Sequence, residues 1–197
     1  MRSFLMLKWA CNEASTINQG MSQLSAIQPP RTLLEVFKML PEGTRVELID
    51  NSLYMSPAPT TNHQDASGTI YTFLNMHVIK GKLGKAFAAP IDVYLSKTNA
   101  FQPDIVFISN DNLDTIKEEG IYGAPDLVIE ILSPGTRKLD LTKKKDAYEK
   151  AGVKEYWIVD PVTKEVIGFH PVKNKFVEFK REKAKISSSL LKSTFKF

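Results

Sequence analysis

The sequence predicts an α/β fold in which one central mixed β-sheet carries helices on its faces. Apolar residues at helical spacing mark two helices at about 62–78 and 141–150. Nearly continuous apolar runs at 127–132 and 156–159 are typical of strands buried on both faces. The order of helix, strands, helix and strand along the chain indicates one mixed sheet with helices on its faces.

Composition bounds the class of protein. The chain has 197 residues, 43% hydrophobic and 24% charged, which suits one globular domain with tails. Its single cysteine, Cys11, excludes an internal disulfide and suits a reducing compartment. A net charge of +4 gives a mild bias toward anionic partners. No apolar run approaches the roughly 20 residues needed to span a bilayer, so we expect a cytoplasmic protein without a membrane partner.

We expect three parts along the chain. Residues 1–30 are interpreted as a loose leader, since 12–30 is rich in Ser, Gln and Asn and has little apolar periodicity; the alternative is an extra helix packed on the domain. The domain itself is predicted at 31–185. The Lys- and Ser-rich residues 186–197 are predicted to form a fraying tail, although Leu190 and Leu191 could dock on the domain.

The first elements follow from capping and turn signals. Thr32 can cap a short helix that runs to about Leu40. Residues 45–50 and 53–56 are predicted to be two strands of a hairpin. Asn51 and Ser52 are expected to join them, because Asn tolerates the positive φ of a tight turn.

The long helix at about 62–78 is expected to begin at Thr61 or Asn62 as its cap and to end at Gly81 and Gly84. Its apolar stripe comprises Ala66, Ile70, Phe73, Leu74 and Val78. Strands are predicted to follow at 86–89, 91–95 and 105–109, and then a loop with a short helix at 110–123.

The second half alternates strand and helix. The buried strand at 127–132 is followed by the helix at about 141–150, for which Gly152 is the expected C-cap. After the strand at 156–159, the segments 166–170 and 176–180 are predicted to pair as a hairpin. Its aromatic residues, Phe169 and those of 176–179, exceed what a solvated hairpin needs, so we predict a homodimer through this surface.

Two carboxylates stand out because they interrupt apolar strands. Glu130 lies in the middle of the buried strand, and Asp104 stands at the start of another. A buried ionised carboxylate is costly unless it is paired or binds a cation. Adjacent strands lie about 4.8 Å apart, so the two residues could hold Mg²⁺ together. The alternative is that each caps a strand end or pairs with an Arg or Lys.

The helix after Glu130 carries a second candidate group. Asp140, Lys144 and Tyr148 are spaced four residues apart and therefore share one face. A lysine there can reach back toward the end of the Glu130 strand. The alternative is a solvated basic helix, given the run of lysines at 143–145, with Asp140 as a simple N-cap.

Together these motifs resemble the Uma-two family, which consists of restriction-endonuclease-like proteins of the PD-(D/E)XK nuclease superfamily. The matching segments are 46–50, 55–59, 63–64, 89–93, Gln102-Pro103-Asp104, Ala124–Pro134, Asp140 with Lys144 and Tyr148, and Glu155–Pro161. They occur in order and cover about residues 31–170. The resemblance implies a restriction-endonuclease-like fold.

The resemblance also implies roles for single residues. Asp104 matches the metal-binding Asp and Glu130 the next acidic ligand. Leu132 occupies the slot where the superfamily's triplet normally has Lys. The resemblance implies that this lysine has migrated to the following helix, where Lys144 matches and Lys145 is the fallback.

Three further residues match less decisively. Glu47 corresponds to an acidic position often found near the site. His63 and Asp92 are further candidates, each of which could equally be structural. Asn51 stands where the family's hairpin usually has Gly, a conservative change for the backbone.

The function implied is Mg²⁺- or Mn²⁺-dependent hydrolysis of phosphodiester bonds in DNA. The cations of Arg137, Lys138 and 143–145 lie beside Glu130 and could contact a nucleic-acid backbone, or simply aid solubility. Two alternatives stay open. One is a non-catalytic nucleic-acid-binding or scaffolding protein on the same fold, since the superfamily includes members without activity. The other is a metal-dependent hydrolase acting on a small phosphate ester.

Overall fold

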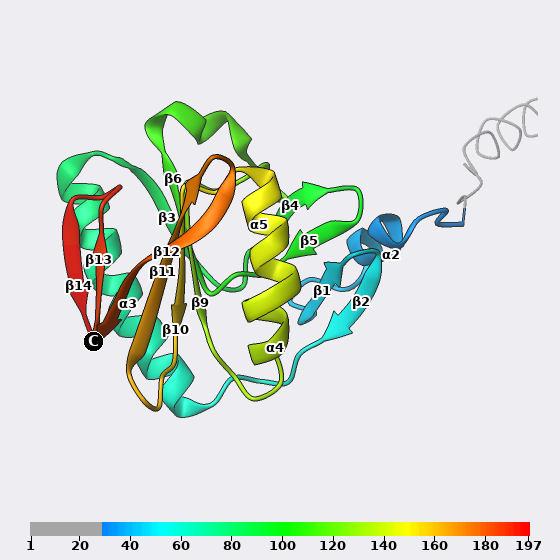
Figure 1. Cartoon of the computed structure of the whole chain (residues 1–197). Coiled ribbons are helices and arrows are strands. Elements are labelled where there is room, and N and C mark those ends of the chain that lie inside the picture. Colours follow the sequence, from blue (N-terminus) through cyan, green and yellow to red (C-terminus); the bar gives the residue numbers. More distant parts are fainter. Residues whose placement is uncertain (1–28) are drawn as a thin grey trace, which may run out of the picture. The chain divides into compact units, whose positions relative to one another are not determined.

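The predicted α/β fold class is confirmed, but the strands form two six-stranded sheets and one two-stranded sheet, not the one sheet that we predicted (Figure 1). The computed structural model describes residues 29–197, so the expectation of a loose leader falls almost wholly outside the described residues. The first sheet has the order β2 (Ser52–Met55), β1 (Val46–Ile49), β5 (Asn99–Phe101), β4 (Val93–Ser96), β8 (Gly120–Tyr122), β7 (Ile116–Lys117). The second has the order β12 (Lys175–Lys183), β11 (Glu165–Val172), β10 (Glu155–Val159), β9 (Leu127–Ile131), β6 (Ile105–Ser109), β3 (Gly84–Ala88).

Prolines stand at three of the four places where the chain between β3 and β9 crosses from one sheet to the other; the fourth crossing, from β6 to β7, runs through the short helix at 110–115. Pro90 separates β3 from β4, Pro103 separates β5 from β6, and Pro125 separates β8 from β9. Proline has no backbone N–H to continue a strand ladder, so each position favours a break in the strand. The prediction of one sheet was wrong because apolar periodicity does not tell which strands pair.

The first hairpin turns one residue earlier than predicted. Asp50 and Asn51, with φ of 47° and 58°, form the turn, and Ser52 already belongs to β2. Positive φ at both central residues is the geometry of a tight hairpin turn. The preceding helix α2 (Leu33–Met39) has the predicted cap, because the Thr32 side chain accepts a hydrogen bond from the backbone N–H of Glu35.

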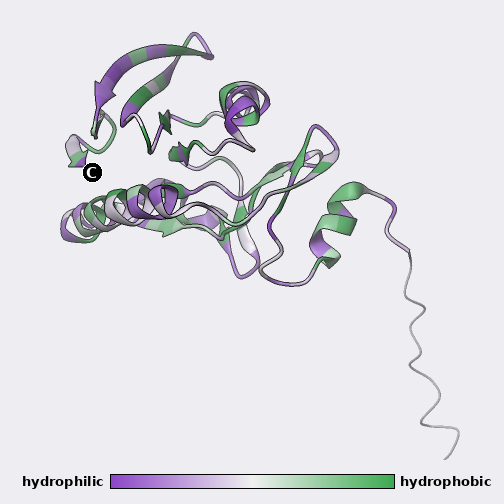
Figure 2. Cartoon of the chain, turned by 90° about the horizontal axis from the view of Figure 1, so that it is seen from below, coloured by the Kyte–Doolittle hydropathy of each residue, from purple (hydrophilic) through white to green (hydrophobic). Residues whose placement is uncertain are grey.

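Helix α3 (Thr61–Gly81) covers one face of the second sheet. Its N-cap is Thr60 rather than Thr61 or Asn62, because the Thr60 side chain accepts from the backbone N–H of His63. Most of the predicted apolar stripe is buried, but Phe73 is 50% exposed and belongs to the outer face. Hydrophobic and hydrophilic residues are accordingly mixed along the helix (Figure 2).

The second long helix lies on the opposite face of the same sheet. It begins at Arg137, four residues before the predicted start, as α4 (Arg137–Leu139), a π-helical turn (Asp140–Lys144) and α5 (Lys145–Ala151). Gly152, at φ 92°, is the C-cap as predicted. The ring of Tyr148 packs between Tyr156 of the second sheet and Phe101 of the first, at 5.1 and 5.2 Å between ring centres.

Strand order places the two candidate carboxylates on neighbouring strands, as predicted. Strands β6 and β9 pair antiparallel, with Ile105 opposite Ile129. Asp104, directly before β6, therefore lies beside the end of β9. Strands β9 and β10 are parallel, and every residue of both is buried. The segment 110–123 contains the expected short helix (Asn110–Thr115) but also the unpredicted β7 and β8.

The predicted fraying tail is instead an ordered hairpin of β13 (Lys185–Ser188) and β14 (Ser193–Lys196). Ile186 pairs with Phe195, and both side chains are buried in the core that α3 shares with the second sheet. In both views the C-terminus lies beside α3. The prediction was wrong because the abundance of Lys and Ser hid the single apolar residue that each strand buries, Ile186 on β13 and Phe195 on β14.

The aromatic residues that suggested a dimer surface are covered within the chain. Phe169 and Phe176 are each 8% exposed and pack near Tyr156. Phe179 packs edge-on against Trp157. The homodimer stays a prediction, but this argument for it was wrong. Within residues 29–197, no helix is long and apolar enough to cross a membrane.

Candidate active site

Asp104 and Glu130 line one pocket at the end of the second sheet. The pocket has a volume of about 280 Å³ and lies between β1, the start of α3, and the loops at 56–60 and 133–136. Asp104 is held in place because its Oδ2 accepts a 2.8 Å hydrogen bond from the backbone N–H of Ile131. This hydrogen bond fixes Asp104, before β6, beside Ile131, which directly follows Glu130 on β9.

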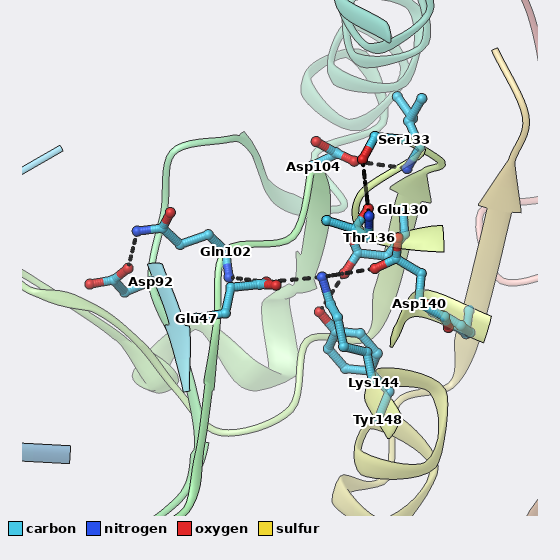
Figure 3. A network of polar contacts seen from close by, with 12 residues as sticks. Glu47, Asp92, Gln102, Asp104, Glu130, Ser133, Thr136, Asp140, Lys144 and Tyr148 are labelled. Atoms are coloured by element: carbon cyan, nitrogen blue, oxygen red, sulfur yellow. Dashed lines mark hydrogen bonds and ion pairs between the residues drawn. The ribbon is translucent and has the colours of Figure 1, made fainter. Parts of the chain in front are cut away.

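Glu130 is buried and doubly bonded through one oxygen. Its Oε1 accepts a 2.9 Å hydrogen bond from the Tyr148 hydroxyl and lies 2.8 Å from Nζ of Lys144 (Figure 3). Burial raises the pKa of the Glu130 carboxyl well above its ordinary value, and neighbouring carboxylates add to this effect. The Lys144 ammonium opposes the shift. Lys144 thus brings to Glu130 the positive charge that Leu132, at the usual lysine position, does not provide.

Lys144 is enclosed by three carboxylates. Its Nζ lies 2.8 Å from Glu130, 2.9 Å from Glu47 and 3.2 Å from Asp140, and the residue is 2% exposed. Burial lowers the pKa of Lys144, but the three negative charges outweigh it and raise the pKa well above the ordinary value. The side chain therefore stays an ammonium. The alternative of a solvated basic helix is wrong for this lysine.

Glu47 and Asp140 are the other two partners. Glu47, on β1, accepts hydrogen bonds at Oε1 from Lys144 Nζ and from the backbone N–H of Gln102, both at 2.9 Å. Asp140 lies inside the helix, so the alternative that it is an N-cap is wrong. Burial raises the pKa of its carboxyl, an effect that the Lys144 ammonium opposes. The i, i+4 spacing of Asp140 and Lys144 was the signal in the sequence for this pair.

His63 also reaches the site. It is buried on the first turn of α3, and its Nε2 lies 3.3 Å from Oδ2 of Asp104. Burial lowers the pKa of the imidazole, but the hydrogen bond to Asp104, the negative charge of Asp104 and a hydrogen bond with the backbone of Ile131 together outweigh burial and raise the pKa. This contact places His63 behind the metal-binding candidate.

Asp92 and Lys145 lie elsewhere. Asp92 accepts hydrogen bonds from Nε2 of Gln102 at 2.9 Å and from the Tyr94 hydroxyl at 3.2 Å, outside the pocket. Nζ of Lys145 lies 4.3 Å from the centre of the Phe169 ring. Both contacts are structural, and Asp92 connects to the site only through Gln102.

Sequence reasoning missed Arg45. This residue lines the pocket, is exposed and makes no ion pair within the described part of the chain. It stands directly before β1, two residues from Glu47. The only signal in the sequence was that a cation and a carboxylate at i and i+2 of one strand point to the same side.

Comparisons with known proteins assign the chain to a family. The family model Uma2, described as "Putative restriction endonuclease", matches residues 33–195. The chain belongs to this family. The resemblance seen in the sequence motifs is thereby confirmed, and the family match extends through the C-terminal hairpin.

One solved structure shares the fold of this Uma2 member. It is described as "a putative nuclease belonging to DUF820 from Anabaena variabilis ATCC 29413", with a TM-score of 0.64 and 24% sequence identity. The match covers 76% of this chain and 84% of the other. Among curated proteins, no sequence matches this chain.

The donor set can be compared with what a divalent metal needs. Within residues 29–197, no three His, Cys, Asp or Glu side chains are arranged as a complete metal site. Asp104 and Glu130 each use only one carboxylate oxygen in the hydrogen bonds and ion pairs given above. Mg²⁺ is commonly bound through one or two carboxylates and several waters. The residues present therefore fit a weakly held, water-rich Mg²⁺ site.

Proposed function

We propose that this Uma2 protein is a Mg²⁺- or Mn²⁺-dependent endonuclease that hydrolyses phosphodiester bonds of DNA. One observation carries the proposal: the buried ammonium of Lys144 touches Glu130, whose strand neighbour is Asp104, in a single pocket. An ammonium beside a pair of acidic ligands is the arrangement that the family resemblance implies. It arises here although the usual lysine position is Leu132.

Asp104 and Glu130 would hold the metal ion. When bound, such an ion supplies Lewis acidity and lowers the pKa of a coordinated water. The chain's own contribution is to fix the ligands: Ile131 N–H orients Asp104, and the Tyr148 hydroxyl orients Glu130. Outer hydrogen bonds of this kind set the orientation of metal ligands.

Lys144 acts by charge and not by proton transfer. Its raised pKa keeps it protonated, so it does not serve as a base for the attacking water. Its charge offsets part of the negative charge of the buried carboxylates and favours the approach of a phosphodiester. Because Lys144 is almost fully buried, we assign it an electrostatic role beside Glu130 and not a direct contact with the substrate.

Arg45 is the cation that faces the substrate. It is exposed at the pocket mouth and has no carboxylate partner among the described residues, so its guanidinium is free to contact a phosphate oxygen. Lys143, 43% exposed, adds a second cation on the helix side, 3.6 Å from Asp50. These residues would attract the nucleic-acid backbone to the carboxylates.

The non-catalytic alternative predicts carboxylates tied up by arginine. Within residues 29–197, Glu130 pairs with a lysine and a tyrosine, and Asp104 pairs with a histidine and a backbone amide. No arginine occupies either carboxylate there. The absence of arginine there favours the catalytic proposal, whereas the pairing of Glu130 with a lysine is also what the structural alternative predicted.

The size of the pocket supports a second candidate function, the hydrolysis of a small phosphate ester. About 280 Å³ lies just below the range of roughly 300–1,000 Å³ typical of small-ligand sites, and a duplex about 20 Å wide would have to reach the carboxylates from outside. A small phosphate ester fits the pocket directly. Metal-dependent hydrolysis of such an ester is therefore the second candidate.

One experiment separates the candidates. Purified full-length protein is incubated with Mg²⁺ or Mn²⁺ and with supercoiled plasmid, single-stranded DNA, or bis(p-nitrophenyl) phosphate. The endonuclease proposal expects nicked or linear plasmid, abolished by EDTA and by Asp104→Asn, with Asp92→Asn unaffected as the matched control. Hydrolysis of the small ester alone would favour the second candidate. No cleavage of any substrate would favour the non-catalytic protein.

A further inference from the structure

The C-terminal part of the chain gathers lysines at one point, a feature that the proposed active site does not use. The backbone N–H of Ala184 donates to the carbonyl of Lys164, and the carbonyl of Ala184 accepts from the N–H of Phe197. Lys183 and Lys185 flank Ala184, and Lys185 stands directly opposite Lys196 in the hairpin. We call Lys164, Lys183, Lys185 and Lys196 the C-terminal lysine cluster.

Few carboxylates balance this cluster. Lys185 lies 3.4 Å from Glu182. Among the described residues, Lys164, Lys183 and Lys196 have no carboxylate within ion-pair distance. Glu165 stands directly opposite Lys183 in the sheet but pairs with Arg181. Lys164 instead lies over the ring of Phe197, at 5.1 Å. Three of the four lysines therefore have no carboxylate counterion among the described residues, which suits an anionic partner.

Strand register connects the cluster to the active site. One row across the second sheet joins Ile131, next to Glu130, to Val159, Val166 and Glu182. Glu182 directly precedes Lys183. Neighbouring strands lie about 4.8 Å apart, so this row spans about 14 Å from β9 to β12. The lysine cluster and the catalytic carboxylates therefore lie at the same end of the sheet.

The residues between them are also partly cationic. Arg137, at the start of α4 and 53% exposed, pairs at 2.8 Å with Asp160, which follows the end of β10. Lys164 follows in the turn between β10 and β11. Along one strand of a B-form duplex, phosphates repeat every 3.4 Å or so of helix axis, so about 14 Å corresponds to roughly four base pairs.

We propose that the C-terminal lysine cluster is a second contact for the nucleic-acid backbone, about four base pairs from the catalytic carboxylates. It rests on the proposed function, because the ligand is the substrate of that nuclease. The small pocket holds the reacting phosphate, and the cluster holds phosphates farther along the same molecule. Lys164, Lys183 and Lys196 make the contacts, and Lys185 remains neutralised by Glu182.

Matched variants test the surface. The test variant carries Lys164→Gln, Lys183→Gln and Lys196→Gln. The control carries Lys80→Gln, Lys85→Gln and Lys173→Gln, which are exposed, have no ion-pair partner in the described chain and remove the same charge. Lys80 and Lys85 lie at the far end of α3 and β3, and Lys173 lies at the far end of the β11–β12 hairpin. Lys173 has a positive φ of 50°, close to the 62° of Lys164, so the control also matches the backbone conformation of one test position.

Binding of a fluorescently labelled DNA duplex is followed by anisotropy in EDTA, where cleavage does not interfere. Each lost phosphate contact lowers the slope of log affinity against log salt by about 1, so the test variant should lose about 3, with affinity at least about tenfold weaker. The control should match the wild type. Circular dichroism checks folding, and the single exposed change Lys183→Glu should weaken binding in the same direction.

Equal losses in both variants, no loss in the test variant, or no DNA binding by the wild type would overturn the inference. So would binding of the cluster to anionic phospholipid vesicles without binding to DNA. Cleavage is measured separately on the same proteins. If the wild type binds DNA through the cluster but does not cleave it, the nuclease proposal is wrong and the cluster remains a nucleic-acid-binding surface. If the wild type cleaves DNA and the cluster variants bind normally, the nuclease proposal holds and the cluster proposal is wrong.

Discussion

The ammonium of Lys144 lies 2.8 Å from the carboxylate of Glu130, and both side chains are 3–4% exposed. Lys144 comes from the helix that follows the Glu130 strand, not from the strand itself. Two further carboxylates, Glu47 and Asp140, contact the same ammonium. The cation is therefore a shared counterion, and its removal affects both folding and function.

Replacing this lysine by methionine should destabilise the protein strongly. Lys144→Met leaves three buried carboxylates without their cation, a loss of about 3–5 kcal/mol in the free energy of unfolding. The carboxyls of Glu130 and Asp140 have a raised pKa in the folded state, so they bind protons more tightly there than in the unfolded chain. The defect should consequently grow as pH rises above their ordinary pKa of about 4. Urea unfolding at several pH values measures it.

Cleavage should be abolished in Lys144→Met while metal binding largely remains. Lys143→Met is the matched control, because Lys143 is 43% exposed and contacts only Asp50 and the Tyr54 ring among the described residues; it should do little beyond slightly weakening nucleic-acid binding. An exposed pair of this kind contributes about 0–1 kcal/mol. Equal stability and equal activity of the two variants would refute a special role for Lys144.

The hydroxyl of Tyr148 should matter more than that of its neighbour Tyr156. Tyr148→Phe removes a hydrogen bond to the Glu130 carboxylate, a loss of about 1.5–3 kcal/mol, and should weaken Mn²⁺ affinity about 10- to 100-fold. Tyr156→Phe removes a bond to the backbone carbonyl of Asp140 and should leave Mn²⁺ affinity unchanged. Calorimetric titration with Mn²⁺ decides, and identical affinities would count against Glu130 as a ligand.

Glu155 should hold the C-terminal hairpin on the domain. Its buried carboxylate accepts hydrogen bonds from the Trp157 indole, the Ser188 hydroxyl and the backbone N–H of Leu190. Glu155→Gln turns an acceptor into a donor there and should cost about 1–3 kcal/mol. Hydrogen exchange should speed up in residues 185–196, whereas the exposed Glu165→Gln should change it little. Unchanged protection in that segment would contradict the assignment.

Gly168 should tolerate no side chain. A Cβ there would lie 2.5 Å from the Trp157 ring, in a fully buried part of the sheet. Gly168→Ala should therefore lower the free energy of unfolding by about 1–3 kcal/mol. Gly68→Ala is the control, because a Cβ on that exposed helical residue meets nothing within 4 Å. The control should gain up to about 1 kcal/mol, and the same sign in both variants would show the contact to be unimportant.

The sequence by itself determined the local elements and the family. Helical spacing located α3 and α5, and apolar runs located β9 and β10. Capping residues marked helix ends where expected: Thr32 begins α2 and Gly152 ends α5. These signals are local, since they depend on side chains a few residues apart. The same spacing placed Lys144 and Tyr148 on one face, and the order of the motifs identified the family.

Tertiary structure alone decided how the strands divide into two sheets and what surrounds the lysine. Glu47 reaches Lys144 from 97 residues away, and Gln102 holds Glu47 from a third segment. Spacing along the chain carries no signal for such contacts. They form because burying Lys144 is affordable only where several carboxylates converge. The same holds for the C-terminal hairpin, whose lysines suggested a frayed end until Ile186 and Phe195 were found packed against the core of α3 and the second sheet.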